Sequence, residues 1–324
     1  MSHPRIFVQI ASYRDPECQW TVKDLFEKAR FPENIFVGIC WQYSPEHDDD
    51  CFIEPSPYPE NTRILKFEAQ ESEGVCWARY QAQKLYQGEE YVLMIDSHMR
   101  FIDDWDVELI KELSLCASEK SFLSSYPPGY TPPNKLKENP RPTVLRAKQF
   151  NEYGDIRFDG EALPLDPEVP LRGAFLAAGF IFAKGNLVTD VPYDPYLYFN
   201  QEEICFAARA FTHGWDAYSA TKTFIYHWYN TSSDKRRLHW EDNKDWSKMQ
   251  TRSKQRYNYL LCHIKPENPD NLVELENYNL GTVRSLAEFE EFSGLDFTLK
   301  IASEKALTSG FIENLNQYKI AAAE

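Results

Sequence analysis

The sequence predicts an α/β protein in which a mostly parallel central sheet is flanked by helices and followed by a C-terminal helical appendage. Apolar, strand-like runs alternate with helical segments in the first hundred residues, a spacing typical of parallel sheets. Residues 91–95 are apolar throughout, as expected for a strand buried on both faces. The run ends in the polar triplet Asp96-Ser97-His98. Ligands bind at the carboxyl ends of strands in open α/β sheets, so this triplet is the first candidate site.

In the first half of the chain, strands are expected at residues 5–11, 34–40, 63–67, 91–95 and 121–126, and helices at 17–30 and 74–86. The next helix is expected to begin near residue 103, directly after the triplet. The turn at 12–16 offers backbone N–H groups and a helix N-terminus to an anion. Arg14 in this turn either adds positive charge there or forms a surface ion pair with Asp15 or Glu17.

The second half begins with a Pro-rich segment, 127–146, which we interpret as a long loop forming a rim or lid. Residues 171–184 are small and apolar, so they form either a packed core strand or backbone lying close to a ligand. A helix at 201–211 precedes Gly214, and a strand is expected at 223–229. Candidate helices follow at 251–261, 286–292 and 304–315. We place the boundary between main domain and C-terminal extension at residue 235, giving 1–235 and 236–324.

The composition excludes several classes of protein. A net charge of −15 argues against a general nucleic-acid binder, which needs a basic surface. The seven cysteines are odd in number and contain no C-x-x-C pair, which indicates buried free thiols in a reducing compartment. No secretory h-region and no apolar run of 18 residues is present. We therefore expect a cytoplasmic protein without a membrane span. The usual G-x-G-x-x-G and Walker motifs are also absent.

The candidate site residues each have an ordinary structural alternative. Asp96 and His98 are two positions apart, so in extended backbone they project from one face. The alternative is that Asp96 caps a turn and His98 is solvated. His227 on its apolar strand is either a further ligand or a core histidine. Glu202 and Glu203 lie in the first turn of a helix, where they would complement its dipole by about 0.3–1 kcal/mol each without any chemical role.

Four segments carry a resemblance to a known family. They are IFVQIASYRDPEC, VGICWQ, GVCWARYQAQKLYQGEEYVLMIDSHMRFIDDWD and VPYDPYLYFNQEEICFAARAFTHGWDAY. The chain resembles the GlcNAc-transferase family that includes the cytoplasmic enzymes glycosylating Skp1 on hydroxyproline. It is also distantly similar to the polypeptide GalNAc-transferases. In those enzymes a DxD-like Asp-x-His triplet ends a strand, W-G-G-E-N begins a helix, and a later histidine completes a metal site. Asp96 and His98 match the triplet, residues 199–203 fall on W-G-G-E-N, and His227 falls on the last histidine.

The resemblance implies a GT-A fold with residues 1–235 as the nucleotide-sugar-binding catalytic domain. It implies retaining transfer of a sugar, GlcNAc in this family, from a UDP-sugar donor to a protein or glycan hydroxyl. It also implies a divalent metal, usually Mn²⁺, held by Asp96, His98 and His227. Asp96 and Glu202 are the implied catalytic residues. The implied UDP-sugar contacts are Ala11, Ser12, Arg14, Arg79, Ser97, Gly179 and Glu203.

The chain also departs from the polypeptide GalNAc-transferases. Asn200 and Gln201 stand where W-G-G-E-N has its glycine pair, and we expect no counterpart of the lectin domain. Two other functions stay open at this point. A metal-dependent nucleotide-sugar hydrolase can use the same Asp/His/His set to activate water. A non-catalytic nucleotide- or carbohydrate-binding protein can keep the fold without turnover. Free sugar formed without an acceptor would favour the first, and UDP binding without any turnover would favour the second.

Overall fold

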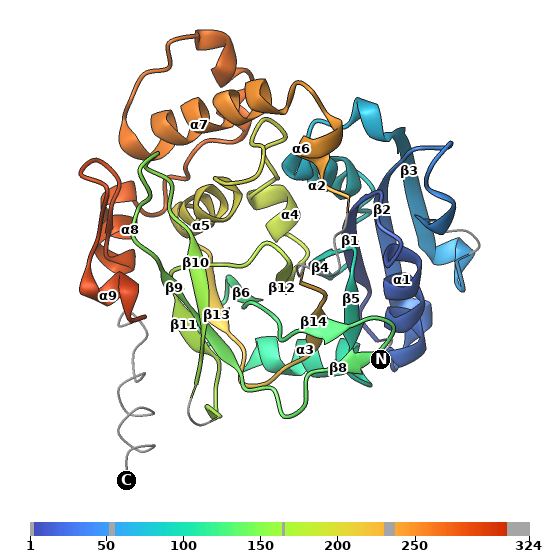
Figure 1. Ribbon diagram of the computed structural model, residues 1–324. Coiled ribbons are helices and arrows are strands. Elements are labelled where there is room, and N and C mark those ends of the chain that lie inside the picture. Colours follow the sequence, from blue (N-terminus) through green and yellow to red (C-terminus); the bar gives the residue numbers. More distant parts are fainter. Residues whose placement is uncertain (1–2, 52–55, 164–165, 230–236, 310–324) are drawn as a thin grey trace.

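The computed structural model describes residues 3–51, 56–163, 166–229 and 237–309. An eight-stranded sheet crosses the molecule in the order β11-β13-β6-β12-β4-β1-β2-β3 (Figure 1). Strands β4, β1, β2 and β3 are parallel, whereas β12 runs antiparallel to both of its neighbours. The predicted α/β fold with a mostly parallel sheet flanked by helices is confirmed. The strands of this sheet are β1 (Ile6–Tyr13), β2 (Ile35–Tyr43), β3 (Thr62–Glu68), β4 (Tyr91–Asp96), β6 (Ser121–Ser124), β11 (Leu171–Gly173), β12 (Phe180–Lys184) and β13 (Asp216–Ser219).

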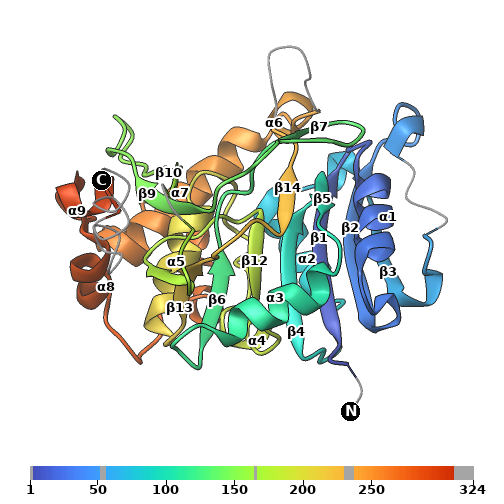
Figure 2. The same ribbon diagram turned by 90° about the horizontal axis from the view of Figure 1, so that it is seen from below.

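Helices cover both faces of the sheet (Figure 2). Alternation along β4 shows why, since Leu93 and Ile95 pack with α1 and α3, while Val92 and Met94 pack with α2 and α5. The strand is therefore apolar on both sides, as its sequence predicts. The helices are α1 (Cys18–Lys28), α2 (Val75–Gln83), α3 (Trp105–Ser114), α4 (Leu187–Asp190), α5 (Glu202–Thr212), α6 (His239–Asp242), α7 (Trp246–Cys262), α8 (Leu286–Ser293) and α9 (Glu304–Leu307).

A second, two-stranded sheet separates the triplet from α3. Strand β5 (Met99–Phe101) begins one residue after His98 and pairs antiparallel with β14 (Ile225–His227). The helix predicted near residue 103 therefore starts only at Trp105. The predicted strand at 223–229 is shorter than expected and lies outside the large sheet. Because β5 and β14 pair, the two histidines at their ends become neighbours.

The Pro-rich segment is anchored rather than a plain loop. It contains the short strands β7 (Tyr130–Thr131) and β8 (Lys135–Leu136), and it leads into β9 (Thr143–Ala147), which pairs with β10 (Phe158–Ala162). The buried guanidinium of Arg100 donates to the carbonyl of Pro133 and forms an ion pair with Glu17. A buried charge needs such partners, so the segment is fixed against the start of α1.

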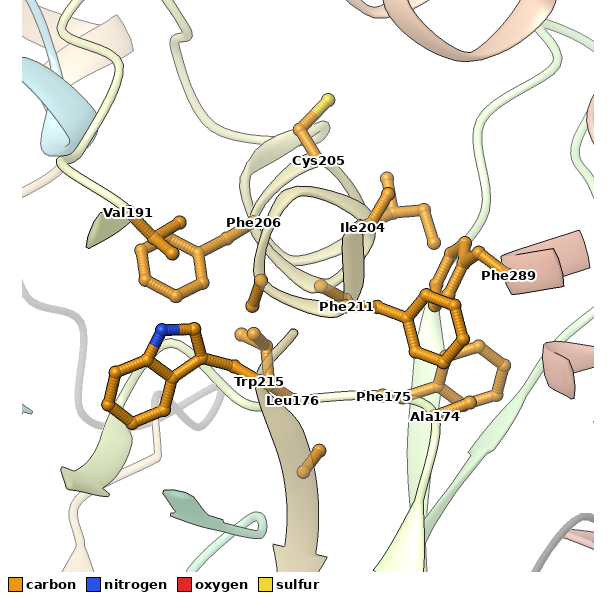
Figure 3. Packing of buried hydrophobic residues seen from close by; sticks show 14 of the residues in the cluster. Ala174, Phe175, Leu176, Val191, Ile204, Cys205, Phe206, Phe211, Trp215 and Phe289 are labelled. Carbon is orange, nitrogen blue, oxygen red and sulfur yellow. The ribbon is translucent and has the colours of Figure 1, made fainter. Parts of the chain in front are cut away.

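Helix α5 is the most deeply embedded helix beside the candidate site. Almost all of its residues are buried, and Phe206 and Phe211 pack on opposite sides against Trp215 and Phe289 (Figure 3). Burying an aromatic side chain contributes roughly 1.5–3 kcal/mol. This packing holds the helix rigidly, so the two glutamates of its first turn have fixed positions.

The C-terminal region packs on α5 and shares its apolar cluster through Tyr257, Leu260 and Phe289. The predicted boundary at residue 235 stays a prediction. The candidate helix at 304–315 begins as α9, and its residues from 310 onward lie outside the described part. All seven cysteines are free, and all except Cys116 are buried. Within the described ranges, no helix combines the length and the apolar character that crossing a bilayer requires.

Candidate metal and donor site

Asp96, His98 and His227 converge at the carboxyl end of β4, as the sequence predicts. Their ligand atoms lie within 4.8 Å of one another. The Nε2 atoms of His98 and His227 are 3.0 Å apart, and His227 Nε2 is 3.2 Å from Asp96 Oδ2. The β5–β14 pairing fixes this approach, because the Trp228 backbone N–H donates to the His98 carbonyl at 3.1 Å. The histidine on the later strand is thus part of the cluster at the sheet edge.

The orientation of His98 comes from Asp15, a residue that the sequence analysis did not select. Asp15 Oδ2 lies 2.6 Å from His98 Nδ1 and also accepts the Ser97 hydroxyl at 2.6 Å. Burial opposes ionisation of Asp15, but His98 and Ser97 outweigh it and lower its pKa to about 2. A carboxylate at Nδ1 keeps the proton there, so Nε2 presents its lone pair towards the cluster. The Ser97 side chain therefore donates its hydrogen bond to Asp15.

The donor set fits a divalent metal. One carboxylate oxygen and two imidazole nitrogens converge, and two Nε2 atoms 3.0 Å apart are placed to share a cation. Mixed oxygen and nitrogen ligands suit Mn²⁺ better than Mg²⁺, which prefers oxygen. The absence of a side chain at Gly179 also favours this arrangement, because a Cβ at this position would lie 2.6 Å from Asp96 Oδ2. Only glycine leaves that carboxylate in place.

Arg79 connects the cluster of Asp96, His98 and His227 to helix α5. Its Nη2 donates to Asp96 Oδ1 at 2.6 Å, and its Nε lies 2.8 Å from Glu202 Oε1. Burial opposes ionisation of Asp96, but Arg79 and the two histidines hold its pKa well below the usual range. The two oxygens of Asp96 therefore have different neighbours, with Oδ1 on the guanidinium and Oδ2 on the imidazole side.

Two cavities meet at the cluster. The first has a volume of about 380 Å³, and Ala11, Ser97 and His98 are among its lining residues. The second, of about 390 Å³, is lined in part by Arg79, Gly179, Glu202 and Glu203. Both volumes fall in the range of small-molecule sites. Four residues line both cavities, and they are Val75, Asp96, Phe199 and His227.

The sequence matches the glycosyltransferase (GlcNAc) family over residues 5–61 and 56–299. The chain belongs to this family. It matches no protein of curated function by sequence. Among solved structures it is similar to GalNAc-T7 with UDP, GalNAc and Mn²⁺, with a TM-score of 0.64, 11% identity, and coverage of 89% of this chain and 56% of that chain. It is also similar to S. aureus TarS 1-349 with UDP-GlcNAc, with a TM-score of 0.47, 16% identity, and coverage of 78% and 66%. The chain thus spans little more than half of the GalNAc-T7 chain. The similarity to GalNAc-T7 confirms the predicted GT-A fold, and the family match confirms that the chain belongs among the glycosyltransferases.

Two of the residues predicted to contact the UDP-sugar, Arg14 and Ser12, line neither cavity. Arg14 donates to Asp48 at 2.9–3.1 Å and to Asp242 at 2.7 Å, and not to Asp15 or Glu17 as the ion-pair alternative supposed. Ser12 is buried, and its carbonyl accepts from Gln42 Nε2 at 3.0 Å. The other predicted residues line at least one cavity, and they are Ala11, Arg79, Ser97, Gly179, Glu202 and Glu203, with the metal cluster between.

Further residues line the two cavities, and the sequence did not indicate all of them. His239 lines the first cavity, with Nδ1 2.7 Å from the Tyr198 hydroxyl and Nε2 2.9 Å from the Ser72 carbonyl. Its only signal was an aromatic pair within the charged segment at 234–248. Arg237 was not missed, because the sequence places it in a basic run, 235–237, that either forms a solvated face or closes over a phosphate. Arg237 lines this cavity, and residues 235 and 236 lie outside the described part. Tyr126 lines the second cavity and donates to Glu203 Oε2 at 2.7 Å.

Proposed function

We propose that this glycosyltransferase transfers GlcNAc from UDP-GlcNAc to a hydroxyl acceptor, with a divalent metal and with retention of the anomeric configuration. The observation that carries the proposal is the convergence of Asp96, His98 and His227 between two cavities. Family membership supports glycosyl transfer, and the family's description favours GlcNAc as the sugar. The similar GalNAc-T7 structure contains UDP, GalNAc and Mn²⁺, which supports a UDP-linked donor and a divalent metal.

The residues of the site divide between the metal and the two parts of the donor. Asp96, His98 and His227 would hold Mn²⁺, which when bound acts as a Lewis acid on the leaving diphosphate. Asp15 and Arg79 orient these ligands. We assign the first cavity, with Ala11 and Ser97, to the nucleotide. The second cavity, with Gly179, Glu202 and Glu203, takes the sugar and the acceptor.

The remaining predicted residues keep supporting roles in this proposal. Glu202 stays in the catalytic set together with Asp96, because it lines the cavity and fixes Arg79. Ser12 and Arg14 line neither cavity and would hold the turn after β1. The acceptor is a protein or glycan hydroxyl, and the relation to the Skp1 hydroxyproline enzymes, like a cytoplasmic location, is a prediction from the sequence.

A donor screen tests the proposal. UDP-GlcNAc, UDP-GalNAc and UDP-glucose are each incubated with the protein in Mn²⁺ or in EDTA, with and without candidate acceptors. The products are identified by mass spectrometry. We expect metal-dependent consumption of UDP-GlcNAc. UDP should raise the melting temperature with Mn²⁺ and much less with EDTA, because it binds only the folded state.

Other outcomes of the screen would change the proposal. Stabilisation by GDP or CMP but not by UDP would contradict the donor. Free GlcNAc as the sole product with every acceptor would favour a hydrolase, and UDP binding without any turnover would favour a binding protein.

A further inference from the structure

Two adjacent glutamates at the start of α5 have different surroundings. Glu202 Oε1 lies 2.8 Å from the buried guanidinium of Arg79. Glu203 accepts the Tyr126 hydroxyl at Oε2, at 2.7 Å, and the Ala178 backbone N–H at Oε1, at 3.0 Å. In the part of the chain that the structure describes, no lysine or arginine forms an ion pair with Glu203. Among the described residues, Glu202 therefore faces a guanidinium, whereas Glu203 is held by neutral hydrogen-bond donors.

The Glu203 carboxylate is built into the wall of the second cavity. Its hydrogen bond to Ala178 places it next to Gly179, where a Cβ would touch the metal-side oxygen of Asp96. A carboxylate oxygen has two lone pairs, and each oxygen of Glu203 uses one for Tyr126 or Ala178. A second lone pair on each oxygen is available to a hydroxyl group in the cavity. The position is rigid, because α5 is embedded in the core.

The surroundings of Glu203 raise the pKa of its carboxyl. Burial raises the pKa of this carboxyl to about 7, and the negative charges of Glu202 and Asp96 add to the effect. The Tyr126 hydroxyl and the Ala178 N–H act in the opposite direction. Other charged or titratable groups that line the cavity are Arg79, Lys148, Arg157, His227 and Tyr229. A base with a pKa near the working pH is the most effective kind.

We propose that Glu203 is the general base that accepts the proton of the acceptor hydroxyl. As the acceptor oxygen bonds to C1 of the sugar, the bond from C1 to the phosphate oxygen breaks, and its electron pair leaves with UDP. The acceptor proton moves to the Glu203 carboxylate and from there to solvent. The stereochemical outcome depends on the face of the sugar that the acceptor approaches, not on the identity of the base. This inference rests on the proposed function and assigns one residue within it.

The test compares two glutamates that each accept one backbone N–H and one side-chain hydroxyl. Glu112 in α3 accepts the backbone N–H and the hydroxyl of Thr221 at 2.6 and 2.9 Å, and it lines neither site cavity. Glu203→Gln and Glu112→Gln are assayed with UDP-GlcNAc and Mn²⁺, with water as the acceptor, by release of GlcNAc and UDP. Calorimetry measures the binding of UDP with Mn²⁺.

We expect Glu203→Gln to lower kcat by about 100-fold or more, the scale of losing a general base. Its affinity for UDP with Mn²⁺ should stay within about threefold, and Glu112→Gln should match the wild type. Wild-type kcat should fall below pH 7, where Glu203 becomes protonated, and this dependence should disappear in Glu203→Gln. Formate should partly restore kcat to Glu203→Ala, since a small carboxylate can replace the missing base.

An NMR titration of carboxyl-labelled protein without metal adds a readout that needs no turnover. One glutamate should titrate near pH 7, and its signal should be missing in Glu203→Gln. The inference is overturned if no carboxyl titrates there, if Glu203→Gln keeps its kcat and pH profile, or if the variant raises KM alone. A wild-type enzyme that consumes no UDP-sugar under any condition removes the proposed function and this inference with it. Normal turnover by Glu203→Gln removes the inference alone.

Discussion

In the described part of the chain, two clusters bring possible metal ligands to within 4.8 Å, yet they differ in what surrounds them. The first is Asp96, His98 and His227, and the second is Asp48, Asp50 and Cys51. In the second, Arg14 donates to both oxygens of Asp48, and Arg237 lies 3.2 Å from Asp50. Burial raises the pKa of the Cys51 thiol, so it stays protonated and is a poor ligand. Guanidinium groups already supply the positive charge there.

Among the described residues, the first cluster has one guanidinium neighbour, that of Arg79, bonded to one oxygen of Asp96. Its other members are imidazoles, which bring nitrogen lone pairs, and a buried carboxylate orients one of them. Closeness of acidic groups is therefore weak support for a metal site. Lone pairs aimed at a common point, with partners that fix them, are the stronger support for the site proposed at Asp96, His98 and His227.

The largest effect is expected from Asp96→Asn. The change removes the charge that faces the metal and deprives Arg79 of a partner, so we expect Mn²⁺-dependent UDP affinity and turnover to fall by more than ~100-fold. The matched change in the second cluster is Asp50→Asn, which should leave both unchanged. Calorimetry and the UDP-GlcNAc assay measure the pair. Equal losses in both variants would make the distinction between the clusters wrong.

Asp15→Asn tests the orienting carboxylate. Without it, His98 loses the partner that fixes its tautomer, and affinity for Mn²⁺ should fall by about 10–100-fold, as is usual for such partners. Electron paramagnetic resonance of free Mn²⁺ measures the affinity directly. A change of less than about twofold would mean that the β5–β14 pairing alone orients the imidazole.

Gly179→Ala tests the close approach to Asp96. The new methyl group would lie 2.6 Å from Oδ2, so the carboxylate must move, and Mn²⁺ affinity should fall by about tenfold. The control is Gly129→Ala, where a Cβ would meet only a Tyr229 ring atom at 3.8 Å, an ordinary contact. Equal affinity in the two variants would show that the carboxylate can relax without loss.

The second cluster should influence stability and leave metal binding unchanged. Burial opposes ionisation of Asp48, but Arg14 lowers its pKa below the usual value of 3.8. Its stabilisation is therefore present above that value and is lost as the pH falls through the folded-state pKa. Asp48→Asn should lower the free energy of unfolding by about 1–3 kcal/mol at pH 7. Urea denaturation should show this difference shrinking towards pH 3, and a difference that grows on acidification would contradict the assignment.

Local sequence patterns predicted most of the fold and two of the three residues in the Asp96, His98 and His227 cluster. Apolar residues that recur with a period of two or 3.6 located the main strands and helices. The two-residue spacing of Asp96 and His98 placed these two side chains on one face. His227 came into the cluster only through the family resemblance, because the β5–β14 pairing has no local signal. The partners of Arg14 lie 34 and 228 positions away, and the role of Asp15 depends on a histidine 83 positions away. Such contacts are set by tertiary packing and leave no periodic trace.

The pairing of β5 with β14 also joins parts of the chain that are synthesised at different times. The two imidazoles are 129 positions apart, so closing this contact carries a large loop-closure cost unless other structure brings the strands together. All eight strands of the main sheet end by Ser219, before His227 leaves the ribosome. The sheet can therefore form first and shorten the distance for the last ligand. The proposed metal would then meet a folded chain with a defined geometry, and defined geometry is how proteins select an ion against the intrinsic order of affinities.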